Sequence, residues 1–286
     1  MILIADSGST KTDWCLLHAD GQRMYFAGEG INPYFQHQQD VARIARDTFQ
    51  HHLPGSPERI YFYGAGCSSP EKQMLVKQGL LEVFSDTRVQ VDHDMLAAAR
   101  ALCHNSAGIA CILGTGSNSV LFNGSEINED VPSLGFILGD EGSGAYLGKE
   151  LIRRFLYREL PEWLHESFVR EFKLNRDTIL EQVYKKPLPN RYLASFSPFI
   201  HAHLNVPEMH DLVYRAFEAF IKHHISKYTN YHHTPMHCTG SVAYHFKSIL
   251  EEVCSDYHIQ LGHVVKSPLE GLTTYHEQQW KKENNL

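Results

Sequence analysis

Residues 6–13, Asp-Ser-Gly-Ser-Thr-Lys-Thr-Asp, combine groups that bind anions with carboxylates that bind cations. A short glycine-containing turn can point several backbone N–H groups at one anion, and its hydroxyls add further donors. Lys11 adds a compact positive charge that suits phosphate. Asp6 ends an apolar run and can hold Mg²⁺ through water, because Mg²⁺ prefers one or two carboxylates together with substrate phosphate. The alternative is an ordinary polar hairpin in which Asp6 accepts from loop N–H groups.

A second turn, at residues 114–118 (Gly-Thr-Gly-Ser-Asn), offers the same chemistry after another apolar run. The two openings align at an offset of 108 residues, and each predicts a buried strand, a small turn and a returning strand. This similarity indicates a duplicated α/β domain. Neither turn is a P-loop, since no Gly-Lys-Ser/Thr follows, and the third glycine of a dinucleotide loop is missing. We expect the two turns to hold a polyphosphate from both sides.

A carboxylate pair, Asp92 and Asp94, lies where a predicted strand meets an alanine-rich helix. A carboxylate at such a place can act as a general base on a sugar hydroxyl, and Asp94 directly adjoins the helix. The alternative is an ordinary helix N-cap, and Asp92 and Asp94 can divide the capping role and the base role between them.

Residues 138–144, Leu-Gly-Asp-Glu-Gly-Ser-Gly, open another predicted helix. Asp140 or Glu141 could be its N-cap, or Asp140 could bind a substrate hydroxyl or the water shell of a metal. The glycines allow a ligand to approach the backbone closely. Farther on, residues 239–243 (Thr-Gly-Ser-Val-Ala) form a small-residue turn between strand and helix, against which a flat nucleoside could lie.

The elements that must position these motifs follow from apolar periodicity. In the first hundred residues the pattern predicts the order βββαβαβα. Strands are expected at 2–6, 13–18, 22–28, 59–64 and 88–92, with helices at 38–52, 70–84 and 94–103. The second part repeats strands at 108–113, 119–122, 236–239 and 258–265, with helices at 142–159, 161–172, 176–184, 206–228, 244–254 and 268–282. We therefore expect an α/β protein with domains at 1–105 and 106–286, the second enlarged by helices, and helix 268–282 packing back on the first.

Composition excludes several classes of protein. The 286-residue chain has a net charge of −7, which argues against a surface that neutralises nucleic-acid phosphates. No apolar run approaches the length of a membrane span and no secretory signal opens the chain, so we expect a cytoplasmic protein without a membrane or nucleic-acid partner. The six Cys form no CxxC pair and are expected to be reduced. The 19 His include clusters at 51–52, 223–224 and 232–233. They predict either a metal site or, in the plainer interpretation, surface imidazoles.

Together, residues 6–13, 114–118 and 240–243 resemble the phosphate-1, phosphate-2 and adenosine motifs of the actin/Hsp70/sugar-kinase superfamily. With residues 30–33 (Gly-Ile-Asn-Pro), Asp94 and residues 134–145, the chain is similar to N-acetylglucosamine kinases of the BadF/BadG/BcrA/BcrD ATPase family. The resemblance implies two ribonuclease-H-like (actin-like ATPase) domains with a central cleft. It also implies ATP and Mg²⁺ as cofactors, a small sugar as substrate and a homodimer. The zinc-binding Cys cluster of the ROK branch is missing, which argues against that branch.

The resemblance also implies roles for single residues. Asp94 would be the base that activates the sugar 6-hydroxyl, and Asp6 would position Mg²⁺. Asn32, Asn118 and Asp140 would hydrogen-bond the sugar, and residues 64–68 (Gly-Ala-Gly-Cys-Ser) would approach its N-acetyl group. The phosphates would be held by Gly8, Ser9, Thr10, Lys11, Thr115 and Gly116, and the adenine and ribose by Gly240 and Ser241.

Two other functions stay open from the sequence. One is an ATP-dependent activator of radical dehydratases, whose iron–sulfur cluster needs thiolates at a dimer interface; Cys103 and Cys111 are available for it. The other is a sugar sensor that keeps the fold without the chemistry. Which sugar is preferred is not determined by these motifs.

Overall fold

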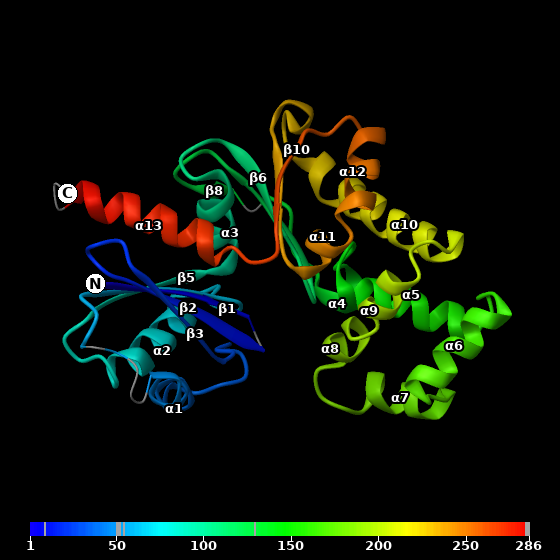
Figure 1. The fold of residues 1–286 in the computed structure, drawn as a ribbon, viewed down its shortest axis with the longest axis horizontal. Helices are drawn as coiled ribbons and strands as arrows, with labels where there is room; N and C mark the ends of the chain where they lie inside the picture. Colours follow the sequence, from blue (N-terminus) through cyan, green and yellow to red (C-terminus); the bar gives the residue numbers. More distant parts are fainter. Residues whose placement is uncertain (9, 50–52, 54, 129, 284–286) are drawn as a thin grey trace. The chain divides into compact units, whose positions relative to one another are not determined.

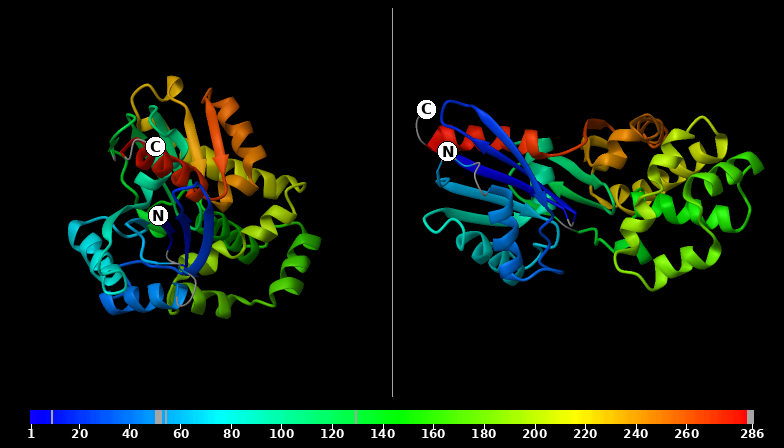
Figure 2. Two further views of the ribbon diagram at one scale, coloured as in Figure 1. Left: turned by 60° about the vertical axis from the view of Figure 1, so that its left-hand side comes forward. Right: turned by 60° about the horizontal axis from the view of Figure 1, so that its bottom comes forward.

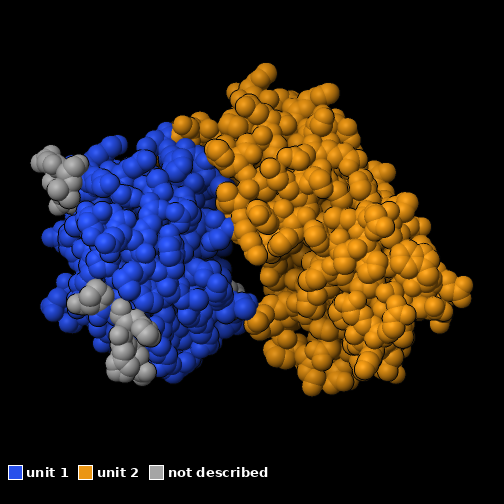
Figure 3. All heavy atoms as spheres, in the orientation of Figure 1, with its two compact units in different colours: residues 1–105, 267–286 blue, residues 106–266 orange. Residues whose placement is uncertain are grey.

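The computed structural model describes residues 1–8, 10–49, 53, 55–128 and 130–283. The chain forms two compact units, residues 1–105 with 267–286 and residues 106–266, which we call unit 1 and unit 2 (Figure 3). Each unit contains one five-stranded mixed sheet with helices packed on it (Figure 1). The predicted α/β class is therefore confirmed. No helix among the described residues is both long and apolar enough to cross a membrane.

Unit 1 follows the predicted order βββαβαβα and then adds the C-terminal helix. Its elements are β1 (Ile2–Ser7), β2 (Lys11–Leu17), β3 (Arg23–Glu29), α1 (Gln38–Phe49), β4 (Arg59–Gly64), α2 (Pro70–Leu81), β5 (Arg88–His93), α3 (Asp94–Cys103) and α13 (Leu269–Glu283). The predicted helix at 38–52 is described as far as Phe49, and residues 50–52, with the His51–His52 cluster, lie outside the described residues.

The sheet of unit 1 has the order β3-β2-β1-β4-β5, with β1 antiparallel to β2 and parallel to β4. Side chains of β1 alternate between two apolar cores, as the period of a strand requires. Leu3 and Ala5 belong to the core that faces α1 and α2, whereas Ile2 and Ile4 belong to the core that includes α3 and α13. Helices therefore cover both faces of this sheet (Figures 1 and 2).

Helix α13 is fixed to unit 1 by polar contacts as well as by apolar packing. Arg23 of β3 pairs with Glu277 at 2.7 Å, and the Tyr63 hydroxyl of β4 lies 2.8 Å from His276 Nε2. Gly271 lies against α3 so closely that a Cβ there would be 2.4 Å from the carbonyl oxygen of Ala101. A glycine at this crossing lets the two helix backbones approach each other.

Unit 2 contains a second sheet and a larger set of helices. Its elements are β6 (Gly108–Leu113), β7 (Ser117–Phe122), β8 (Ile127–Asn128), α4 (Gly135–Leu138), α5 (Gly144–Leu156), α6 (Glu162–Phe172), α7 (Arg176–Tyr184), α8 (Pro189–Ala194), α9 (Ser197–Ala202), α10 (Pro207–His223), two 3-10 turns (Ile225–Lys227 and Tyr231–His233), β9 (Met236–Thr239), α11 (Ser241–His245), α12 (Lys247–Asp256) and β10 (Leu261–Val265).

The two sheets repeat one topology. The order in unit 2 is β10-β9-β6-β7-β8, so β6 occupies the place of β1, β7 that of β2 and β9 that of β4. Strand directions agree as well, because β6 is antiparallel to β7 and parallel to β9. The duplication inferred from the two turns is thus present in both sheets.

Several elements differ from the sequence prediction. The short helices α8 and α9, the single turn α4 and the two-residue strand β8 were not predicted. The helix expected at 206–228 ends at His223, and the one expected at 244–254 is two helices separated at Phe246. The unpredicted elements α4, α8, α9 and β8 are too short to produce a recognisable apolar period.

Candidate functional site

Asp6 and Asp94 lie at the same edge of the sheet in unit 1. In the strand register, Asp6 of β1 is level with Tyr63 of β4, and Tyr63 is level with Asp92 of β5. These three strands are parallel, so their carboxyl ends meet at one edge, where ligands of open α/β sheets bind. Asp94 begins α3 two residues after Asp92.

The electrostatics of this edge are dominated by carboxylates. Burial, together with the negative charges of Asp94 and Asp13, raises the pKa of Asp6 to about 7. Asp13 is the cross-strand partner of Asp6 on β2. Neighbouring carboxylates disfavour one another's ionised form, and a bound cation would relieve that repulsion.

The donor set at this edge suits Mg²⁺, which takes carboxylate oxygens and keeps several waters. Within the described residues, no group of three or more His, Cys, Asp or Glu is gathered around one point where a metal could be held. A metal at Asp6 would therefore take most of its ligands from water and phosphate, as the sequence motif predicts.

The first turn is firmly held at its base. The Gly8 N–H donates to the Lys11 carbonyl at 3.0 Å, and the Ser7 and Thr12 hydroxyls lie 2.7 Å apart. Gly8 and Thr10 are exposed at the tip, whereas Ser9, also predicted to bind phosphate, lies outside the described residues. Lys11 is half exposed and pairs with Asp13 at 2.6 Å, so an anion would compete with that carboxylate for it.

The loop that carries Asn32 is joined to this turn. Ser7 Oγ accepts from the Ile31 N–H at 3.0 Å, and the buried Asn32 accepts from the Tyr34 N–H through Oδ1 at 3.0 Å. Gly66 has a φ of +83°, and a Cβ on it would be 2.4 Å from Asn32 Oδ1. The structure thus brings the predicted sugar residue Asn32 against residues 64–68, the loop predicted to approach the N-acetyl group.

Asp92 and Asp94 have different surroundings. Asp92 accepts from the Gln90 amide at 2.8 Å and lies 3.9 Å from the Arg100 guanidinium. The N-cap of α3 is His93, which makes no side-chain capping bond, so the capping interpretation of the two aspartates is wrong. Asp92 is thus held by Gln90 and Arg100, whereas the negative charge of Asp94 raises the pKa of Asp6.

In unit 2, Asp140 is held against the second turn. Its Oδ1 accepts from the Ser117 N–H at 3.4 Å, and a Cβ on Gly116 would be 3.0 Å from its Oδ2. Asp140 has a φ of +57° and is 8% exposed, and this burial raises its pKa.

The capping interpretation of Asp140 and Glu141 is wrong. Ser143 caps α5 by accepting from the Tyr146 N–H at 3.1 Å. Asn118, on β7, accepts from the Ser119 N–H at 2.8 Å. The structure therefore brings Asp140 to the turn at 114–118, where it bonds Ser117, while the Asn118 side chain bonds Ser119.

The strand–helix turn at Gly240 requires glycine. Its φ is +120°, and a Cβ there would be 2.2 Å from the Leu113 carbonyl oxygen. The Gly240 N–H donates to the Val265 carbonyl at 3.1 Å, which ties this turn to the end of β10. Three strand ends, of β6, β9 and β10, thus meet at one place in unit 2.

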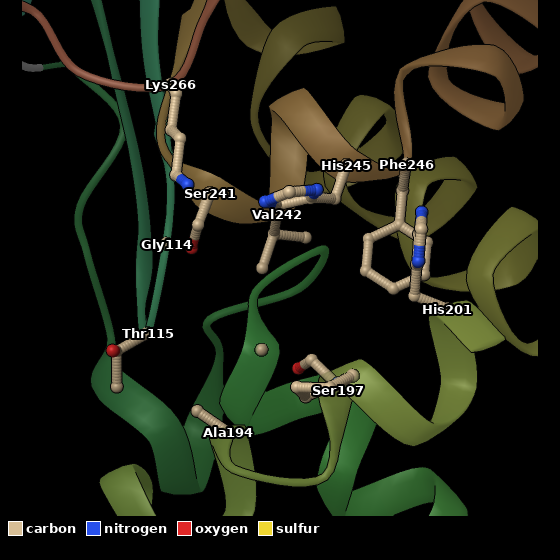
Figure 4. A pocket seen from close by; sticks show the side chains of 12 residues that line it. Gly114, Thr115, Ala194, Ser197, His201, Ser241, Val242, His245, Phe246 and Lys266 are labelled. Carbon is tan, nitrogen blue, oxygen red and sulfur yellow. The ribbon is translucent and has the colours of Figure 1, made fainter.

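A cavity of about 470 Å³ opens at these strand ends (Figure 4). This volume is within the range of small-ligand sites. Gly114, Thr115 and Ser241 line it, so the turn at 114–118 and the turn at 239–243 share one cavity, whereas Gly116 and Gly240 are not among its lining residues. Sequence reasoning missed Ser197, His201, His245 and Lys266, which also line it. Ser197 and His201 belong to α9, which was not predicted, and no motif marks the other two.

The cysteines are placed as core side chains. All six are free thiols and buried. Burial raises the pKa of Cys103 to about 12, so its thiolate, the form that ligates iron, is strongly disfavoured. Cys111 is fully buried within β6.

Comparison with known proteins decides the family. No family model and no curated protein matches the chain. The chain is similar to a crystal structure from Porphyromonas gingivalis named as a putative N-acetylglucosamine kinase, at 45% identity and a TM-score of 0.93. The match covers 98% of this chain and 100% of the other. The chain belongs to the family of that protein.

Two more distant structures agree in fold alone. One is a putative N-acetylglucosamine kinase from Chromobacterium violaceum, with 17% identity, a TM-score of 0.76 and coverage of 96% of this chain and 98% of that one. The other is a ROK family glucokinase from Streptomyces griseus in complex with glucose and AMPPNP, with 13% identity, a TM-score of 0.58 and coverage of 97% and 98%. The predicted actin-like ATPase fold of sugar kinases is thereby confirmed, whereas the BadF/BadG/BcrA/BcrD family name stays a prediction.

Proposed function

We propose that this protein is an ATP-dependent kinase that transfers the γ-phosphate of ATP to the 6-hydroxyl of an amino sugar, N-acetylglucosamine. The observation that carries the proposal is the pair of interacting carboxyls at the strand edge of unit 1, Asp6 and Asp94. It is supported by the family of the Porphyromonas gingivalis protein, which is named as a putative N-acetylglucosamine kinase. We also propose that the protein acts in the cytoplasm as a homodimer.

In this mechanism Asp94 is the base. Its carboxylate accepts the proton of the sugar 6-hydroxyl as that oxygen attacks the γ-phosphorus, and ADP leaves. Asn32, Asn118 and Asp140 orient the sugar through its hydroxyls and amide. The contact of Asn32 with the loop at 64–68 favours that loop as the wall for the 2-acetamido group.

The phosphates would be held by the two turns, through Gly8, Ser9, Thr10 and Lys11 in unit 1 and through Thr115 and Gly116 in unit 2. Ser241 would hold the nucleoside in the cavity of unit 2, and Gly240 would shape the turn that positions it. Asp6 would hold Mg²⁺, which neutralises phosphate charge when bound. Bound Mg²⁺ would also lower the pKa of Asp6, because positive charge favours the carboxylate.

An iron–sulfur activator is disfavoured by the cysteines. A cluster shared by two subunits requires thiolates at a surface, and Cys103 and Cys111 are buried thiols. A sugar sensor would have the same fold, so only turnover separates it from a kinase.

The test is a coupled ADP-release assay with ATP and Mg²⁺ over a panel of hexoses and amino sugars. We expect rapid turnover with N-acetylglucosamine and little ATP hydrolysis without sugar, since these enzymes must exclude water from the transfer. Hydrolysis of ATP that is independent of sugar would contradict the proposal that the protein is a sugar kinase. Sugar binding in calorimetry without turnover would favour the sensor, and a brown, iron-containing protein would favour the activator.

A further inference from the structure

Two features of the sequence have no role in the proposed function: Glu141, in the motif at 138–144, and the histidine pair at 223–224. In the structure they meet. His224 Nε2, at the end of α10, lies 3.5 Å from Glu141 Oε2, in the loop before α5. His223 is exposed, as the plainer interpretation of the histidine clusters predicts, whereas His224 is 5% exposed and contradicts it.

The imidazole of His224 has a defined environment. Its ring stacks on Phe220, with the ring centroids 4.9 Å apart at 26°. Its Nδ1 is buried and has no hydrogen-bond partner among the described residues, so the polar contact of the ring is the one with Glu141. A carboxylate accepts hydrogen bonds but cannot donate them, so the proton of a neutral ring belongs on Nε2. Burial lowers the pKa of His224 and thereby favours this neutral, donating form.

Glu141 is largely buried and depends on this contact. Its side chain is 16% exposed, and His224 is its ion-pair partner among the described residues. A carboxylate that loses its donor in such a place must move toward water, because a desolvated and unpaired carboxylate is costly. Any movement of Glu141 is transmitted to Asp140 through the peptide bond that joins them.

The backbone on both sides of Glu141 is left-handed. Asp140 has a φ of +57° and Gly142 a φ of +75°. A non-glycine residue keeps this conformation only where its surroundings fix it. The end of the loop is bonded to the second turn, because the Gly144 N–H donates to the Gly114 carbonyl at 2.8 Å. The contact with the histidine ties the middle of the loop to α10.

We propose that His224 is a positioning residue of the kinase: through Glu141 it fixes the loop that presents Asp140 to the sugar. The inference rests on the proposed function, in which Asp140 binds the sugar, and it names two residues to which that function gave no role. The negative charge of Glu141 raises the pKa of Asp140, so the two carboxyls are close enough to interact. A Glu141 released from His224 would therefore disturb both the position and the ionisation of Asp140.

Steady-state kinetics test this role. His224→Phe keeps an aromatic ring on Phe220 but removes the Nε2 donor. We expect it to raise the KM for N-acetylglucosamine by roughly five- to fiftyfold, because loss of a hydrogen bond to a charged group is only partly transmitted to Asp140. The kcat and the KM for ATP should stay within about threefold of the parent, as expected when sugar binding alone is weakened.

Two further variants at this end of α10 serve as controls. His224→Gln has a side-chain amide that can donate in place of Nε2, so it should bring the sugar KM back to within about threefold of the parent. His223→Phe makes the same substitution at the adjacent exposed histidine and should match the parent.

A double-mutant cycle shows whether His224 acts through the loop. In a protein that already carries Asp140→Ala, His224→Phe should lower kcat/KM for the sugar by less than about twofold more. Glu141→Gln keeps an oxygen that accepts from Nε2 and should stay near the parent. Glu141→Leu removes that oxygen and should reproduce His224→Phe, so it replaces that variant if the latter folds poorly.

The outcomes separate this inference from the proposed function. If the parent phosphorylates no sugar, the proposed function fails and the positioning role fails with it. If the parent is active, the positioning role alone is overturned by a parental sugar KM in His224→Phe, or by a loss that adds fully to that of Asp140→Ala. Equal losses in His224→Phe and His224→Gln, or an equal rise in the KM for ATP, would overturn it as well.

Discussion

The Ser117 N–H donates to Asp140 Oδ1 across 3.4 Å, so a turn between two strands and a residue before a helix are joined in unit 2. Asp140 is buried and has a left-handed backbone, a conformation that a non-glycine residue rarely adopts. Strain of this kind persists only where the surroundings fix it, and it is often found at functional sites. The contact gives Asp140 one defined position, from which it would bind a sugar hydroxyl in the proposed function.

Gly116→Ala tests that position. The new Cβ would be 3.0 Å from Asp140 Oδ2, so the carboxylate must move. We expect turnover to fall by roughly tenfold or more, the range for a small displacement of a positioned group. A double-mutant cycle with Asp140→Ala checks the cause: if the alanine at 116 acts through Asp140, it adds little once Asp140 is gone. Fully additive losses would show that the two residues act separately.

The raised pKa of Asp6 predicts an effect on stability. The folded protein holds a proton on Asp6 up to about pH 7, whereas the unfolded chain releases it near pH 4. The folded state therefore binds more protons in that window, and stability falls as the pH rises through it. Asp6→Asn removes this loss. At pH 8, without ligand, we expect its Tm to exceed that of the parent by roughly 2–6 °C, and the gap to close near pH 4.

Differential scanning calorimetry between pH 4 and 8 measures this gap. Asp86→Asn, at an exposed carboxylate, is the control and should follow the parent at every pH. A Tm difference between Asp6→Asn and the parent that stays constant from pH 4 to 8 would show that the pKa of Asp6 is not raised in the folded protein.

Gly271→Ala tests how α13 is held on unit 1. Its Cβ would be 2.4 Å from the Ala101 carbonyl oxygen, and two backbones cannot yield as a flexible side chain can. We expect a loss of about 1–3 kcal/mol in the free energy of unfolding, the cost typical of overpacking. Gln278→Ala, at an exposed position of the same helix, should be near neutral in urea unfolding. Equal stability of the two variants would mean that α13 is not packed as described.

Much of this fold is predictable from the sequence because the first strand of each unit, β1 and β6, is buried on both faces. Residues 2–5 and 108–113 are nearly continuous apolar runs, and each leads into polar and glycine residues that differ sharply from the run. The first and second turns contain candidate binding residues. The change from apolar to polar residue types that ends each strand therefore also marks the candidate site. The repeated topology then follows from the similarity of the two turns.

The rest of the site depends on packing that a local pattern does not contain. His201 lines the cavity because α9, a helix of six residues, packs beside α11. The sequence pattern at 197–202 does not indicate that His201 borders a cavity. Likewise, capping by Ser143 instead of Asp140 frees the aspartate for the turn at 114–118. Both residue types are good caps, so only the backbone conformation at Asp140 distinguishes the alternatives.

The most direct test of the account compares Asp94→Asn with Asp92→Asn, two carboxylates that are two residues apart. Each variant is assayed for turnover of N-acetylglucosamine with ATP and Mg²⁺, and sugar binding is measured by calorimetry. We predict that Asp94→Asn binds sugar as the parent does but loses roughly 10²–10⁴-fold in kcat, the typical contribution of a general base. Asp92→Asn loses a weak pair with Arg100 and keeps an oxygen that can accept from Gln90, so it should stay within about tenfold of the parent. Near-parental turnover by Asp94→Asn, or a larger loss in Asp92→Asn, would contradict the assignment of Asp94 as the base.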